Sequence, residues 1–136
     1  MLVIYDKASG LINHILVHAE PGLDHMKKVY TELGKGTLLN PGGSMNDSVT
    51  HYVFDGRIIP RPTVDVVGPG DMSASDLIFH VNQPCELEVS FAGEVVATEA
   101  LQSGPLPFSV EHPGAYQLRF SAPFPFLDAI FNLEVR

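Results

Sequence analysis

The chain has 136 residues, of which 45% are hydrophobic and 18% charged, a composition typical of a folded globular protein rather than a disordered one. Sixteen acidic residues against eight basic ones give a net charge of −8, which argues against a nucleic-acid partner because phosphate binding needs a basic surface. No apolar run approaches the roughly 20 residues of a membrane-spanning helix, the start of the chain lacks the basic region of an export signal, and the single Cys85 allows no intrachain disulfide.

Two β-favouring runs open the chain at residues 2–5 and 11–18, separated by the turn residues 6–10. They predict a β-hairpin with a five-residue loop that ends at Gly10. The second run does not alternate, because Leu11 adjoins Ile12 and residues 15–17 are all apolar. Such a run suits a strand covered on both faces. We therefore expect one face to meet the following helix and the other a partner chain.

A short helix is predicted next, beginning at Pro21 and ending at Gly34. One side of it carries the apolar residues Leu23, Met26, Tyr30 and Leu33. A helix of this length is marginal alone, so it is expected to pack on the hairpin. Residues 34–50 are predicted to be a long loop anchored by Leu38 and Leu39, and a loop of that length is either mobile or held by a partner.

Residues 51–62 mark a change of pattern. Two short strands, residues 51–54 and 57–59, flank Asp55-Gly56, the favoured filler of a type I′ hairpin turn. The stiff segment Pro60-Arg61-Pro62 follows. We therefore predict two parts, a hairpin–helix attachment module over residues 1–60 and an immunoglobulin-like antiparallel β-sandwich over residues 63–136.

The second part is rich in short strands divided by Gly and Pro turns, which is typical of a sandwich. Strands are predicted at residues 63–67, 76–81, 85–91, 94–99, 106–110, 116–121 and 127–135. The last of these alternates strictly, with Ala129, Phe131 and Leu133 expected inside and Ile130 outside. The turn before Tyr116 resembles the late turn of immunoglobulin-like domains, where a tyrosine closes the corner. The predicted fold class is mainly β.

No residue pattern predicts catalysis, a metal site or a cofactor. His14 and His18 are four residues apart, but along a strand that spacing separates side chains by roughly 13 Å. Cys85 occupies an inward strand position, so it is expected to be a small buried side chain and not a reactive thiol. The serines lie in polar loops, and the Gly-rich turns match no phosphate-binding pattern.

Apolar residues in excess of what a small module can bury predict a partner surface, because about 60 residues cover little surface alone. Most aromatic residues near the end of the chain are assigned to the core. Phe124 and Phe126 flank Pro125 in a loop, and for them an exposed apolar patch that binds a partner is the alternative. The predicted partner-binding residues are Leu11, Ile15, Val17, Leu38, Leu39, Phe124 and Phe126.

Four segments carry a resemblance to a known group of proteins: YDKASGLI, THYVFDGRIIPRP, PCELEVSF and PGAYQLRFSAPFPFLDAIFNLEV. In this order they resemble small proteins of tailed bacteriophages that are encoded among virion or tail genes. The resemblance covers nearly the whole chain. It implies a non-enzymatic virion component of the tail or tail-fibre apparatus, assembled in the cytoplasm of the bacterial host, with other virion proteins or a second copy as partners.

A different class of function stays open beside this one. A carbohydrate- or receptor-binding module would also be a β-sandwich, and its partner would be a host surface glycan. Such a module is expected to present exposed aromatic side chains with polar neighbours, and the chain contains no Trp.

Overall fold

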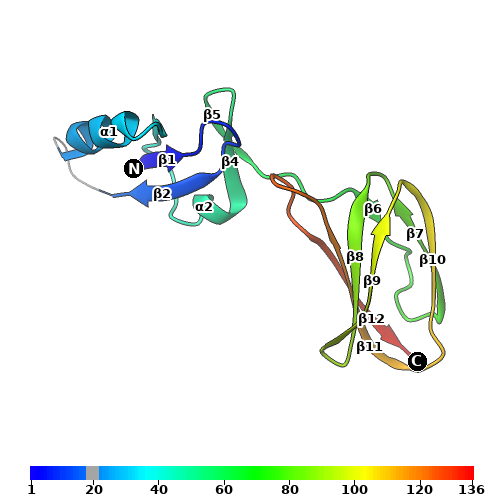
Figure 1. Ribbon diagram of the computed structural model, residues 1–136. Helices are drawn as coiled ribbons and strands as arrows, with labels where there is room; N and C mark the ends of the chain where they lie inside the picture. The colour runs from blue at the N-terminus through cyan, green and yellow to red at the C-terminus, as the bar shows by residue number, and fades with distance from the viewer. Residues whose placement is uncertain (18–21) are drawn as a thin grey trace. The chain divides into compact units, whose positions relative to one another are not determined.

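The computed structural model describes residues 1–17 and 22–136. The chain forms two compact units, Met1–Arg61 and Pro62–Arg136 (Figure 1). The boundary between them lies inside the segment Pro60-Arg61-Pro62. The predicted fold class, mainly β with a hairpin and a short helix before a β-sandwich, is confirmed.

The first unit is built on a three-stranded antiparallel sheet with β1 (Leu2–Tyr5) in the middle. One neighbour of β1 is β2 (Ile12–Leu16), with which it forms the predicted hairpin, and the other is β3 (Gly36–Leu39). Residues 2–4 are buried on both faces of the sheet, at most 1% exposed. Helix α1 (Gly22–Glu32) covers one face, where Met26 and Tyr30 pack near Leu2 and Ile4.

The opposite face of this sheet is covered by the chain itself. Strands β4 (His51–Phe54) and β5 (Arg57–Pro60) form the predicted hairpin, and both residues of its turn have positive φ, as a type I′ turn requires. Val53 of β4 joins an apolar cluster with Val3, Ile12 and Ile15. Its N–H also donates to the Gly10 carbonyl oxygen at 2.9 Å. The prediction that a partner chain covers this face is therefore wrong, because β4 and β5 already occupy it.

The predicted loop over residues 34–50 is wrong in two places. Residues 36–39 are strand β3, in which Leu39 pairs with Leu2 and Gly36 with Tyr5. Residues 47–50 are the short helix α2 (Asp47–Thr50). A strand of four residues carries almost no periodic signal, and only its backbone pairing with the distant β1 fixes it. A turn connects the two elements at residues 40–43, where the Gly43 N–H donates to the Asn40 carbonyl oxygen at 3.2 Å.

The second unit is an antiparallel β-sandwich made of a three-stranded and a four-stranded sheet (Figure 1). The first sheet has the order β10 (Gly104–Ser109), β7 (Asp76–Val81), β6 (Val66–Val67). The second has the order β12 (Ala129–Val135), β11 (Gly114–Ser121), β8 (Cys85–Phe91), β9 (Glu94–Leu101). In constant-type immunoglobulin domains the fourth strand belongs to the sheet of the second strand. Here the fourth strand, β9, pairs with β8 instead.

The sandwich core contains the inward residues that the alternation predicted. On β7 and β11 every second side chain is buried, and Phe79 and Phe120 are 0% exposed. The Phe131 ring of β12 meets the Phe79 ring edge-on, with ring centroids 5.2 Å apart. Ile130 is exposed, as predicted. Cys85 is only half-buried, at the rim of this core, and burial raises the pKa of its thiol.

A tyrosine closes the corner before β11, as the sequence suggested. The Tyr116 hydroxyl donates to the His112 carbonyl oxygen at 2.7 Å, and the buried ring lies against Phe91 with ring centroids 4.7 Å apart. The apolar ring is therefore buried while its polar end is satisfied. This hydrogen bond to the backbone a few residues upstream is the tyrosine corner of immunoglobulin-like domains.

The residues on either side of the unit boundary are each bound within their own unit. In the first unit, the Arg61 N–H donates to the Thr50 carbonyl oxygen and the Arg61 Nη1 to the Val49 carbonyl oxygen, both at 2.9 Å. In the second unit, the Leu127 N–H donates to the Pro62 carbonyl oxygen at 2.7 Å, and the Val64 N–H donates to the Leu127 carbonyl oxygen at 2.9 Å. This pairing replaces the first half of the strand that was predicted at residues 63–67.

Candidate functional site

The predicted partner-binding residues of the first unit divide into exposed and buried ones. Leu11, Val17 and Leu39 are exposed. Ile15 is only 9% exposed, within the cluster that Val53 completes, and Leu38 is half-buried against the same cluster. Ile15 is therefore a core residue of this unit and does not lie on its surface, since the hairpin β4–β5 covers it.

Phe124 and Phe126 do not form the exposed apolar patch that the sequence offered as an alternative to core positions. Both are half-buried, and Phe126 packs against the sandwich core. The Phe126 N–H donates to the Pro123 carbonyl oxygen at 3.2 Å, so this segment folds back on itself as a turn. The adjacent Leu127 is held by the start of the unit, which directs the turn toward the core.

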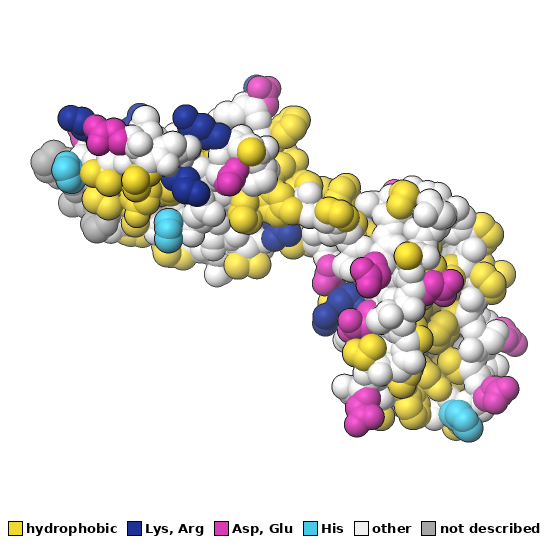
Figure 2. Space-filling view, viewed as in Figure 1, with side chains coloured by type: hydrophobic (Ala, Val, Ile, Leu, Met, Phe, Trp, Pro, Cys, Tyr) yellow, Lys and Arg dark blue, Asp and Glu magenta, His cyan; other side chains and the backbone are white. Residues whose placement is uncertain are grey.

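The first unit displays further apolar side chains that sequence reasoning missed. We call the large apolar residues that are exposed among its described residues the exposed apolar set: Leu11, Val17, Leu33, Leu39, Met45, Val49 and Phe54. Figure 2 shows hydrophobic side chains at several places on this unit. Phe54 could have been found from the hairpin pattern, because its neighbour Val53 points inward and successive strand residues face opposite sides.

Charge is divided unequally between the two units. The first has six acidic and six basic residues and is neutral. The second has ten acidic residues against two basic ones, Arg119 and Arg136, so it carries the whole net charge of −8. In Figure 2 acidic side chains are spread over the visible face of the sandwich, while Lys and Arg are concentrated on the other unit. One unit thus exposes apolar side chains at zero net charge, and the other is strongly acidic.

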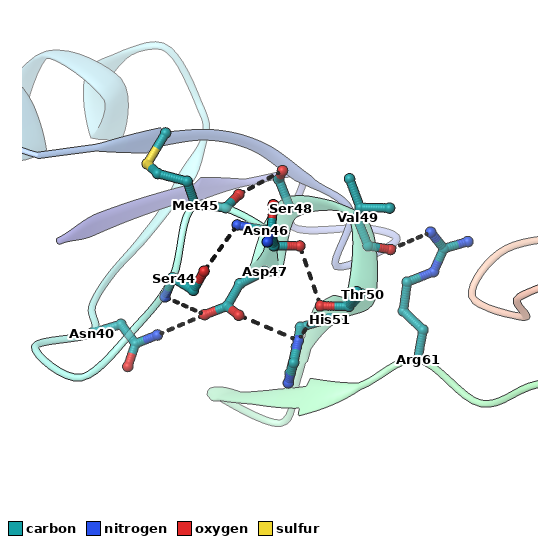
Figure 3. A network of polar contacts seen from close by, with 10 residues as sticks. All are labelled: Asn40, Ser44, Met45, Asn46, Asp47, Ser48, Val49, Thr50, His51 and Arg61. Carbon is teal, nitrogen blue, oxygen red and sulfur yellow. Dashed lines mark hydrogen bonds and ion pairs between the residues drawn. The ribbon is translucent and has the colours of Figure 1, made fainter.

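A network of polar contacts joins residues 40–51 (Figure 3). Asp47 Oδ2 accepts from the Ser44 N–H at 3.0 Å and from Asn40 Nδ2 at 3.5 Å, and Asp47 Oδ1 lies 3.5 Å from His51 Nδ1. The Thr50 hydroxyl lies 2.7 Å from the same His51 nitrogen. A catalytic relay needs the carboxylate and the hydroxyl on opposite ring nitrogens. Both face Nδ1 here, so the network holds the chain around α2 and activates no nucleophile.

The metal reading of the histidines gains no support from the described residues. Within residues 1–17 and 22–136 no group of three or more His, Cys, Asp or Glu side chains is placed to hold a metal ion. The His14 ring lies beside the Tyr30 ring, with centroids 6.0 Å apart, and His18 is outside the described residues. Among the described helices none is long and apolar enough to cross a membrane.

A shallow depression of about 320 Å³ lies on the four-stranded sheet of the sandwich. Its polar lining includes Ser90, Gln117, Asn132 and Glu134, and Gln117 Nε2 donates to Asn132 Oδ1 at 3.2 Å. These groups can donate to and accept from a polar ligand. Every aromatic side chain of residues 62–136 is buried or half-buried, so the depression has no exposed ring on which a sugar could stack.

Two aspartates in turns have lowered pKa values. The Asp6 carboxylate accepts from the backbone N–H groups of Ser9 and Ala8, and these bonds hold the pKa of Asp6 below its ordinary value of 3.8. In the sandwich, the hydroxyl and the N–H of Ser73 do the same for the pKa of Asp71. Both carboxylates stabilise local turns, so their lowered pKa values report on folding and not on catalysis.

These shifts predict how acid acts on each unit. Because the folded pKa of Asp6 lies below the unfolded one, its stabilisation is present above about pH 3.8 and is lost as pH falls through the folded pKa. Asp6→Asn should make the acid unfolding of the first unit less steep below that pH, and Asp71→Asn should do so for the second. Nuclear magnetic resonance titration of each unit would check this. A change in the wrong unit, or none in either, would contradict the assignment.

Comparison of the chain with protein-family models, with curated proteins and with solved structures gives no match.

Proposed function

We propose that this protein is a non-enzymatic structural or accessory component that attaches to a larger assembly through its first unit and displays its second. The observation that carries the proposal is the unequal division of surface properties. The first unit is neutral and exposes the seven residues of the apolar set, whereas the sandwich carries the net charge of −8 and, among the described residues, exposes five large apolar side chains, Val67, Ile78, Val95, Val96 and Ile130. A neutral surface with exposed apolar side chains suits a protein partner, and a strongly acidic unit suits solvent.

The assembly that we propose is a bacteriophage virion, with the protein on the tail or tail-fibre apparatus. This part of the proposal rests on the resemblance of the four segments quoted above to small phage proteins. Other virion proteins, or a second copy of this chain, would then cover the exposed apolar set. The polar network around Asp47 agrees with a non-enzymatic role, because its geometry does not activate a hydroxyl.

A carbohydrate- or receptor-binding role is the second candidate. The depression that Ser90, Gln117, Asn132 and Glu134 line favours it, because amide and carboxylate groups are suitable partners for sugar hydroxyls. The missing exposed aromatic ring in the sandwich weighs against it. If this candidate function is correct, the sandwich binds the glycan and the first unit still attaches the protein to the larger assembly.

Charged substitutions in the exposed apolar set test the attachment. Val17→Asp and Phe54→Asp change exposed residues, so the unit should still fold, which circular dichroism would check. We expect both variants to be absent from particles purified from infected cells and analysed by mass spectrometry, because a buried carboxylate at the interface is costly.

Ile78→Asp is the matched control, since it places the same charge at an exposed apolar position of the sandwich. It should be incorporated as the wild-type protein is. Normal incorporation of the Val17 and Phe54 variants would overturn the role of the first unit. A wild-type protein that is monomeric by light scattering, and whose loss leaves the virion composition unchanged, would overturn the proposal as a whole.

A further inference from the structure

Strand β9 is the most exposed strand of the sandwich. Of its eight residues only Leu101 is buried, and Val95 and Val96 are 56% and 59% exposed. It ends the four-stranded sheet, and within the described residues no segment pairs with its outer edge. Its outer edge therefore presents backbone N–H and C=O groups to solvent along most of its length.

The core-facing side of β9 is also open. Ala97 pairs with Val89 and Glu99 with Leu87, so Ala97 and Glu99 share the face of two buried core residues while they stay exposed. A notch of about 60 Å³ lies there, lined by Leu87, Val89, Ala97, Thr98 and Glu99. The opposing sheet has only three strands, and β9 has uncovered apolar surface next to the core.

A β-bulge places a second glutamate on the same face. Ser90 pairs with Val95 and Val89 with Ala97, which leaves Val96 as the extra residue of β9. Because of this residue Glu94, which pairs with Phe91, faces the same side as Ala97 and Glu99. The successive residues on the core-facing side of β9 are therefore Glu94, Ala97 and Glu99, two acidic side chains with a small one between them.

Two of the three other sheet edges of the sandwich are closed to an added strand. On β10 the exposed residues Pro105 and Pro107 have no N–H to donate, and β6 has only two residues. At β12 the bonds from residues 62–64 reach only Leu127, just before the strand, so among the described residues the outer edge of β12 itself is unpaired. Strand β9 contains no proline. Its protection against pairing with another strand consists of the charges of Glu94 and Glu99 and of the bulge.

These charges disfavour a second copy of the chain as the occupant. Antiparallel self-pairing centred between Val96 and Ala97 would use the whole apolar middle of the strand, but it would set Glu94 opposite Glu99 at both ends. Each sandwich also carries a net charge of −8, so two of them repel. A basic strand avoids both penalties.

We propose that the edge of β9 is a docking site for an extended, basic segment of a partner protein, which adds to the sheet as a further strand. Backbone hydrogen bonds to β9 would supply affinity, as in other cases of strand addition. Specificity would come from alternate side chains, a Lys or Arg opposite Glu99, a β-branched residue opposite Ala97 that fills the notch, and a second Lys or Arg opposite Glu94.

The test is a titration of the isotope-labelled full chain with a synthetic nine-residue peptide, followed by nuclear magnetic resonance. The peptide has Lys, Val and Lys at alternate central positions and Thr elsewhere, and its control has Glu in place of both Lys. We expect saturable shifts of the amides of residues 94–101 with the basic peptide only. Glu99→Lys should weaken binding by about tenfold, since it reverses the charge that faces the peptide.

Glu111→Lys is the matched control, because it changes the net charge equally at an exposed turn residue outside β9. It should leave the affinity close to that of the wild type. Equal losses in both variants, shifts spread over the acidic surface, shifts at β12, or no binding would overturn the proposal. Shifts of β9 that depend on protein concentration without peptide would point to a second copy instead. The expected shifts lie in the sandwich, whereas the proposed attachment uses the first unit. A failure of peptide binding can therefore be distinguished from a failure of attachment.

Discussion

Replacing Phe79 with alanine is expected to lower the free energy of unfolding of the sandwich by roughly 3–5 kcal/mol. The side chain is fully buried at the centre of the aromatic cluster, with its ring centroid 6.0 Å from that of Phe120 and 5.2 Å from that of Phe131. The substitution removes the ring and leaves a cavity that the two neighbouring rings can fill only in part. For a unit of this size the loss is a large fraction of the total stability.

Ile78→Ala on the same strand is the control, because Ile78 is exposed and its loss should cost no more than about 0.5 kcal/mol. Denaturant titration with probes in each unit would measure both variants. Phe79→Ala should shift the transition of residues 62–136 and leave that of residues 1–61 unchanged. A single transition that shifts for both units would contradict the division into separate units, and equal losses at the two positions would contradict the strand register.

The sandwich could be predicted from the sequence because its strands carry a direct signal. In a strand with one buried face the apolar residues recur at every second position, and Leu77, Phe79 and Val81 follow this rule without exception. The tyrosine corner could also be predicted, since its parts lie within a few residues of each other in the chain. Patterns made by residues that lie close together in the chain can be recognised in a single sequence.

The incorrect predictions concern places where the structure depends on contacts with a distant segment of the chain. Strand β3 has four residues and exists because β1 offers it an edge, which no local pattern records. Ile15 was predicted to need a partner, and it does, but Val53 of the same chain supplies the contact. A run of apolar residues shows that a surface has to be covered, and it does not show what covers it.

The outcome for the predicted partner-binding residues also depends on contacts with other segments of the chain. Leu11, Val17 and Leu39 were predicted as partner-binding residues and are exposed, whereas Phe126 packs on the core because its turn folds back. The acidic face of β9 was not recognised. Glu94 and Glu99 are an odd number of residues apart, which in a regular strand places them on opposite faces, and only the bulge at Val96 brings them together.

Replacing Gly10 with alanine is expected to destabilise the first unit by roughly 3 kcal/mol or more. Gly10 has a φ of 81°, which costs an L-residue about 1–2 kcal/mol. A Cβ at this position would also fall on the carbonyl oxygen of Val53, so the hairpin β4–β5 would have to move away from the sheet. Moving it breaks the hydrogen bond from the Val53 N–H to the Gly10 carbonyl oxygen, worth about 1 kcal/mol, and exposes Ile15.

Gly34→Ala isolates the steric contribution. Gly34 has nearly the same φ, 82°, but among the described residues no atom outside Gly34 and its two chain neighbours lies within 4 Å of the position that its Cβ would take. The variant should therefore cost only the 1–2 kcal/mol of the left-handed conformation. Denaturant titration of the full chain would give both values. If Gly10→Ala costs no more than Gly34→Ala, the hairpin β4–β5 does not pack against the β1–β2 turn, and the face that contains Ile15 is free for a partner after all.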